Sequence, residues 1–179
     1  MRRIPVERLV FLDESGLNLA MARSHAWVQK GAEYIERTPM NWGPNLTLLG
    51  AIRVTGWVLL STMFATTNKD RFVAWLVTKL LPRLKRGDVL VLDNLTAHHD
   101  VRVRSWCKTF GVRVLYLPPY SPDFNPIEPG WALQKQHVRR HAPRTRTALL
   151  RIARRARFRV TELHCRQWFA HAGYPAPLR

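Results

Sequence analysis

Three acidic residues stand where they could carry out chemistry together. Asp13 and Asp93 each follow a short apolar run typical of a buried strand, and Glu128 begins a predicted helix after the next such run. Sites in α/β proteins form at the carboxyl ends of strands, so the three acids are expected to converge at one edge of a sheet. Carboxylate oxygens are ligands for hard divalent cations such as Mg²⁺. Two such ions about 4 Å apart activate a nucleophile and stabilise the leaving oxygen in phosphodiester cleavage.

Each acid also has a purely structural explanation. An Asp at the end of a strand is often a turn former. The run Asn125-Pro126-Ile127-Glu128 has the pattern of an N-cap, a proline at the first helical position and an acid at the third. Pro129 weakens that interpretation, because it removes an early backbone donor and disfavours helical geometry at the residue before it. The residues alone leave both explanations open, and Pro129 favours a positioned ligand.

The charge of the chain indicates what it binds. Its 179 residues contain 29 Lys and Arg against 12 Asp and Glu, a formal net charge of +17. No acidic residue lies between Glu128 and Glu162, a stretch that is rich in arginine. A surface of this kind attracts polyanions, and nucleic acid is the expected partner. An anionic membrane surface is the alternative, but the sequence offers no amphipathic anchor with a clean apolar face.

Apolar patterning predicts a mixed α/β domain. The first half contains strands and a hairpin, and the second half alternates strands with helices in the manner of βαβ units. Thr55-Gly56 is expected to form the turn of the hairpin. The predicted strands cover 8–12, 24–31, 46–54, 56–65, 88–92 and 112–117, and the predicted helices 70–84, 98–110 and 125–140.

Cysteine content and hydropathy limit the compartment. Cys107 and Cys165 are far apart and lack metal-ligand spacing, which is typical of a reduced, cytoplasmic protein. No apolar run is long enough to span a membrane, and the N-terminal segment lacks the pattern of a signal peptide. We therefore expect a cytoplasmic, nucleoid-associated protein without a membrane partner.

Three motifs resemble those of one protein family. They are FLDESG at 11–16, VLVLDNLTAHH at 89–99 and LPPYSPDFNPIEPGWALQK at 117–135, with 34 residues between Asp93 and Glu128. Together they resemble the DDE transposases of the Tc/mariner superfamily, in particular the bacterial insertion sequence 630 family. SHAWVQKG at 24–31 is similar to the hairpin that this family has after its first Asp. The resemblance covers roughly residues 8–140.

The resemblance implies a fold, a reaction and a set of ligands. The fold would be RNase H-like, a five-stranded mixed sheet flanked by helices, forming a catalytic domain over 8–141 with a basic helical C-terminal extension at 142–179. Asp13, Asp93 and Glu128 would be the catalytic residues and would bind two Mg²⁺ ions, with Mn²⁺ as a substitute. The family cleaves double-stranded DNA at the ends of its element and joins the freed 3′ hydroxyl to target DNA, usually at TA sites.

One departure from the family pattern concerns DNA recognition. Family members carry a helix-turn-helix region before the first catalytic strand, whereas here Asp13 lies almost at the start of the sequence. We therefore expect the chain to be the catalytic half of a transposase. Either its partner is a helix-turn-helix half from an overlapping frame, or the chain is a truncated copy. The resemblance also implies a homodimer on DNA.

Several residues near the three acids are candidates for supporting roles. His98 either orients a carboxylate, contacts DNA or simply begins a helix, and Asn94 belongs to the same motif. Trp131 is expected to anchor the helix that carries Glu128. Basic residues farther along that helix are expected to contact DNA phosphates, namely Lys135, Arg139 and Arg140.

Two other functions fit the same residues. The first is a DNA-binding fragment without catalysis, which would bind DNA regardless of its sequence and in a salt-dependent way. The second is a different RNase H-fold nuclease, such as one that cuts branched DNA and does not join ends.

Overall fold

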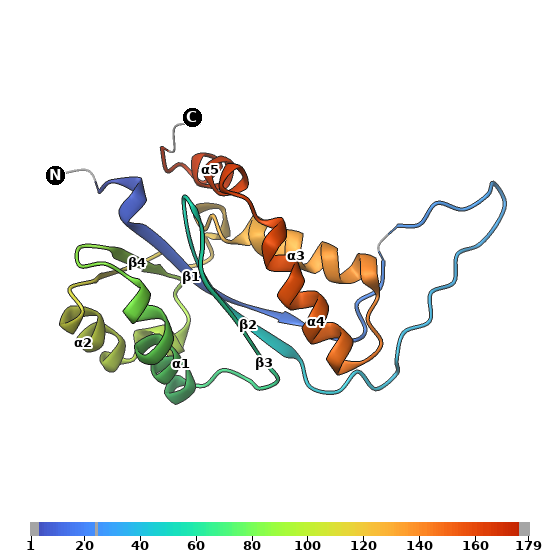
Figure 1. The fold of residues 1–179 in the computed structure, drawn as a ribbon, viewed down its shortest axis with the longest axis horizontal. Helices are drawn as coiled ribbons and strands as arrows, with labels where there is room; N and C mark the ends of the chain where they lie inside the picture. Colours follow the sequence, from blue (N-terminus) through green and yellow to red (C-terminus); the bar gives the residue numbers. More distant parts are fainter. Residues whose placement is uncertain (1–3, 24, 176–179) are drawn as a thin grey trace.

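The computed structural model describes residues 4–23 and 25–175, which form one five-stranded mixed sheet (Figure 1). The strand order is β3-β2-β1-β4-β5. Strands β1, β4 and β5 are parallel, and β2 and β3 are antiparallel to their neighbours. Their bounds are β1 Leu9–Leu17, β2 Leu46–Arg53, β3 Gly56–Met63, β4 Val89–Leu92 and β5 Arg113–Tyr116.

Helices cover both faces of this sheet. One face carries α1 and α2, and the other carries α3, α4 and α5 (Figure 1). After α1 the chain continues through a π-helical turn at Leu76–Leu80 and a 3₁₀ turn at Leu81–Arg83. The helix bounds are α1 Lys69–Trp75, α2 Val101–Thr109, α3 Glu128–His141, α4 Arg146–Ala156 and α5 Glu162–His171. None of the helices among the described residues is both long and apolar enough to cross a membrane.

Alternation along β1 divides the core into two layers. Val10 and Leu12 pack toward α1 and α2, whereas Phe11 and Leu17 pack toward α3, α4 and α5. This is the pattern expected of a strand buried on both faces. Asp13 shares the alternation of Phe11 and therefore faces the layer that contains α3.

The segment after residue 141 contributes to the same core. Leu149 and Ala153 from α4 and Cys165 and Phe169 from α5 are fully buried against residues of β1 and α3. The ring of Phe169 meets that of Phe11 edge-on at 5.3 Å. The boundary at 141 stays a prediction, but α4 and α5 pack as part of one body.

The mixed sheet and its β2–β3 hairpin confirm the predicted architecture, with three local corrections. The helix expected at 70–84 is α-helical only over α1 and continues as the π-helical and 3₁₀ turns. The hairpin expected at 24–31 is wrong, because the described residues of this segment form no strand and Trp27 is fully exposed. Figure 1 shows the later part of the segment between β1 and β2, from about residue 25 onward, as an arm that extends away from the sheet, whereas Leu19 and Met21 pack against the core. The helix expected at 98–110 is divided into a 3₁₀ turn at Thr96–His99 and α2.

Candidate active site

The sequence predicted Asp13 at the end of a strand, but the residue lies inside β1. The strand continues to Leu17, but its parallel pairing with β4 stops at Leu12. Asp13 is thus the first residue of β1 beyond the end of β4, while on its other side it pairs with Gly50 of β2. The end of the shorter neighbouring strand therefore opens the space beside this carboxylate.

Three N–H donors hold the Asp13 carboxylate. The backbone N–H of Glu14 donates to Oδ1 at 2.7 Å, Nε1 of Trp131 donates to Oδ2 at 3.0 Å, and Nδ2 of Asn125 donates to Oδ2 at 3.4 Å. Asp13 is only 6% exposed, and burial raises its pKa to about 7, against the opposing effect of the donors. Glu128 and Asp93 raise the pKa further by like-charge repulsion. Trp131 therefore contacts a catalytic candidate directly in addition to anchoring α3.

Gly50 makes the position of Trp131 possible. A Cβ at this residue would lie 2.5 Å from Cη2 of Trp131 and 2.8 Å from Cζ3 of Trp57. The missing side chain lets both rings pack over β2, with their centroids 5.3 Å apart. The glycine opposite Asp13 thus admits the ring that donates to Asp13.

Asp93 directly follows β4 and is held by the segment after it. Nδ1 of His98 lies 2.5 Å from Oδ1 of Asp93, although the pair is not aligned as a hydrogen bond. The backbone N–H of Leu95 donates to the same oxygen at 3.2 Å. His98 is 1% exposed, its ring packs on Phe72, and its carbonyl accepts a hydrogen bond from Tyr116. This burial favours the carboxylate-orienting role of His98 over the expected DNA contact.

Glu128 is the first residue of α3, so the helix begins three residues later than predicted. The cap interpretation of Asn125 is wrong, because the helix start has no side-chain cap and the Asn125 amide reaches Asp13 instead. Oδ1 of Asn125 is buried and has no partner in the described structure. Pro129 occupies the first turn of α3, where its missing N–H costs nothing.

One cavity of about 380 Å³ brings the three acids together. Asp13, Asp93 and Glu128 all line it, as does the proline-rich segment from Pro118 to Pro122. Asn94 lies at this cavity and contacts the side chain of His99. Tyr120 is fully exposed at the cavity and has a left-handed backbone with φ of 54°, a strained state for a residue other than glycine.

The donor set fits hard divalent cations, which prefer oxygen ligands. Burial and repulsion among the acids make the ionised form of Asp13 costly, as its raised pKa shows. A bound cation would offset that cost. Among the described residues no three Asp, Glu, His or Cys side chains already stand close enough to enclose a metal ion.

The basic candidates lie along α3. Lys135 is half-buried, and Arg139 and Arg140 are exposed at the C-terminal end of the helix, away from the three acids. Sequence reasoning missed Gly50, Asn125 and Tyr120. Of these, only Gly50 could have been found from the sequence, by searching for a glycine on a strand predicted to pair with the strand that carries Asp13.

An RNase H-like catalytic domain is the class that this sheet and its three acids define. A family model described as DDE superfamily endonuclease matches residues 8–150. The chain therefore belongs to the DDE superfamily endonucleases, as the motifs predicted.

Relatives with known names agree with this assignment. The Tc1 transposase of Caenorhabditis elegans is 28% identical over 132 residues, which cover 68% of this chain and 48% of the relative. The Tcb2 transposase of Caenorhabditis briggsae is 26% identical over 140 residues, 73% of this chain and 51% of the relative. The resemblance to Tc/mariner transposases is confirmed, and the chain spans about half the length of these relatives.

Solved structures confirm the fold. The Mos1 mariner paired-end complex with Mn superposes with a TM-score of 0.73 at 18% identity, covering 92% of this chain and 52% of that one. The catalytic domain of Mos1 mariner transposase gives a TM-score of 0.58 at 16% identity, covering 94% of this chain and 84% of that one.

Proposed function

We propose that the chain is the catalytic domain of a transposase, which cuts DNA strands at the ends of a mobile element and joins the freed 3′ hydroxyl to target DNA. The observation that carries the proposal is the cavity shared by Asp13, Asp93 and Glu128. Membership of the DDE endonucleases supports phosphoryl transfer on DNA. The net charge of +17 supports a polyanionic substrate.

We propose that the three carboxylates hold two Mg²⁺ ions, for which Mn²⁺ can substitute. When bound, the ions supply Lewis-acid activation of the attacking oxygen and stabilisation of the leaving oxygen. The chain's own residues set the geometry of the carboxylates. Trp131 and Asn125 donate hydrogen bonds to Asp13 from the α3 side, whereas Asp93 accepts one from the backbone N–H of Leu95 and has the imidazole of His98 against it.

The role of His98 can be tested with two variants. His98→Leu removes the group that orients Asp93 but fills similar space, so we expect Mn²⁺ affinity to fall by about 10- to 100-fold. His98→Asn keeps an N–H donor near the position of Nδ1 and is expected to retain much of the affinity. Titration of Mn²⁺ by calorimetry measures both. Equal losses in the two variants would show that His98 only fills space against Phe72.

The partners follow from the same proposal. We propose double-stranded DNA at element ends and target sites, including TA sites, and a homodimer on paired ends. Structures with a similar fold include a paired-end complex and a strand transfer complex of Mos1, at 18% and 20% identity. Their similarity supports the proposed DNA partner. We further propose that a helix-turn-helix half supplies end recognition and that the chain derives from a bacterial insertion sequence.

The decisive experiment offers element-end DNA to the chain, alone and joined to the proposed helix-turn-helix half, with Mg²⁺ or Mn²⁺. We expect strand cleavage followed by joining, and loss of both in Asp93→Asn. Cleavage of branched DNA without joining would identify a different nuclease. Salt-dependent binding without any metal-dependent cut would identify a DNA-binding fragment.

A further inference from the structure

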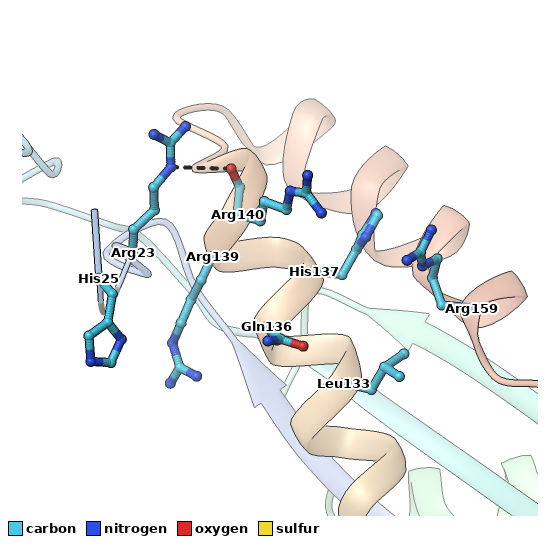
Figure 2. A pocket seen from close by; sticks show the side chains of 8 residues that line it. All are labelled: Arg23, His25, Leu133, Gln136, His137, Arg139, Arg140 and Arg159. Atoms are coloured by element: carbon cyan, nitrogen blue, oxygen red, sulfur yellow. Dashed lines mark hydrogen bonds between the residues drawn. The ribbon is translucent and has the colours of Figure 1, made fainter. Parts of the chain in front are cut away.

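A second cavity lies at the other end of the helix that carries Glu128. It measures about 390 Å³ and we call it the arginine groove. Figure 2 shows Arg139 extending toward the segment that bears Arg23 and His25, while His137 and Arg140 extend toward Arg159. Its lining contains no acid and consists of Arg23, His25, Leu133, Gln136, His137, Arg139, Arg140 and Arg159.

Three arginines of the arginine groove have no acidic partner among the described ion pairs. Among the ion pairs of the described residues, none includes Arg139, Arg140 or Arg159. The nearby acid Glu36 accepts a hydrogen bond from the backbone N–H of Arg23 and forms an ion pair with Arg144 at 2.7 Å, so it offsets charge at Arg23 and not at these three arginines. Burial lowers the pKa of His137, and the charges of His141, Arg159 and Arg140 lower it further. Like charges gathered around one groove repel one another unless an anion binds there.

One side of α3 connects the groove with the three acids. Glu128, Lys135 and Arg139 are spaced by seven and four residues, so they share a stripe of the helix. Arg139 follows Glu128 by eleven residues, which at the helical rise is about 16 Å. For a duplex that runs along α3, at 3.4 Å per nucleotide step, this separation corresponds to about five base pairs.

We propose that the arginine groove binds the phosphate backbone of the same DNA duplex about five base pairs from the bond that is cut, with Lys135 in between. This inference rests on the proposed function, because the catalytic cavity fixes the register of the DNA. The groove contacts phosphates and not base edges, so it positions the duplex without reading its sequence.

Salt dependence tests the groove directly. The variant Arg139→Gln/Arg140→Gln and the parent are titrated with a labelled random-sequence duplex, and anisotropy gives the affinity across a range of salt concentrations. Each lost phosphate contact reduces the slope of log affinity against log salt by about 0.9, so we expect a reduction of about two. The matched control Lys108→Gln/Arg113→Gln removes the same charge from exposed positions around β5 and should leave the slope closer to that of the parent. Equal reductions in both variants, or none in the groove variant, would overturn the proposal.

Crosslinking tests the register. With a photoreactive benzoylphenylalanine in place of Arg139, crosslinks on element-end DNA should lie about five base pairs from the Mn²⁺-dependent cut made by the parent. Crosslinks adjacent to the cut, or spread evenly along the duplex, would contradict it. If the groove variant shows the expected reduction in slope but the parent never cuts DNA, the proposed catalysis is refuted and the proposed role of the groove is retained. A cutting parent whose groove variant keeps the full slope would refute the groove alone.

Discussion

Without divalent metal, the protein is expected to lose stability as the pH rises from about 4 to about 7, and Asp13→Asn is expected to remove most of that loss. Burial raises the pKa of Asp13 from 3.8 to about 7, so the folded state holds a proton that the unfolded state has already released. Ionisation of Asp13 in the folded state therefore costs up to about 4 kcal/mol, fully expressed above pH 7. The effect is read as the difference between the pH profiles of the two proteins, in which titrating groups that are not coupled to Asp13 cancel.

The metal should reverse this pH dependence. Mg²⁺ or Mn²⁺ binds the ionised carboxylate, so the metal is expected to raise the unfolding midpoint of the parent far more at about pH 8 than at about pH 5. In Asp13→Asn the added metal should have little effect at either pH, and cleavage should be lost. Urea unfolding with and without metal provides the measurement. Parallel pH profiles for parent and variant would show that Asp13 is not a buried, destabilised carboxylate.

Gly50→Ala is expected to damage both the fold and the site, although Gly50 touches no substrate. The new Cβ would lie 2.5 Å from Trp131, a buried ring that cannot move without losing its hydrogen bond to Asp13. Overpacking of this kind costs about 1–3 kcal/mol of unfolding free energy. Displacing a residue that orients a ligand lowers metal affinity by about 10- to 100-fold.

Gly16→Ala provides the matched control. Gly16 lies in the same sheet, three residues after Asp13, and a Cβ there would meet no atom within 4 Å. We expect its unfolding midpoint and its Mn²⁺ affinity to stay near those of the parent. If Gly50→Ala matched Gly16→Ala in both measurements, the close approach of Trp131 to β2 would not matter for the site.

The sequence predicted those parts of the site that depend on short segments. The apolar runs of β1 and β4 are long enough to identify and point to Asp13 and Asp93, whereas Glu128 was selected from Pro129 beside it and from the family motif with its spacing from Asp93. The hairpin expected around Trp27 failed for a physical reason. A two-stranded hairpin without further packing is only marginally stable in water, and the arm around Trp27 extends away from the sheet.

Contacts between distant residues were beyond the reach of local patterns. Asn125 has the sequence pattern of a helix cap, yet its amide donates to Asp13, 112 residues earlier in the chain. The need for glycine at position 50 depends on the register of β2 against β1 and on the ring of Trp131 above it. Neither relation leaves a periodic signal, because both arise only when the elements pack.

Mn²⁺ binding to single carboxylate variants tests the central claim most directly, namely that Asp13, Asp93 and Glu128 form one metal site. Asp13→Asn, Asp93→Asn and Glu128→Gln are compared with Asp123→Asn, which removes an exposed acid from the proline-rich segment just before Glu128 but outside the shared cavity. We predict that each of the three loses affinity by about 100-fold or more, since each removes a charged oxygen ligand, while Asp123→Asn binds like the parent. Parental affinity in any one of the three variants would contradict the account.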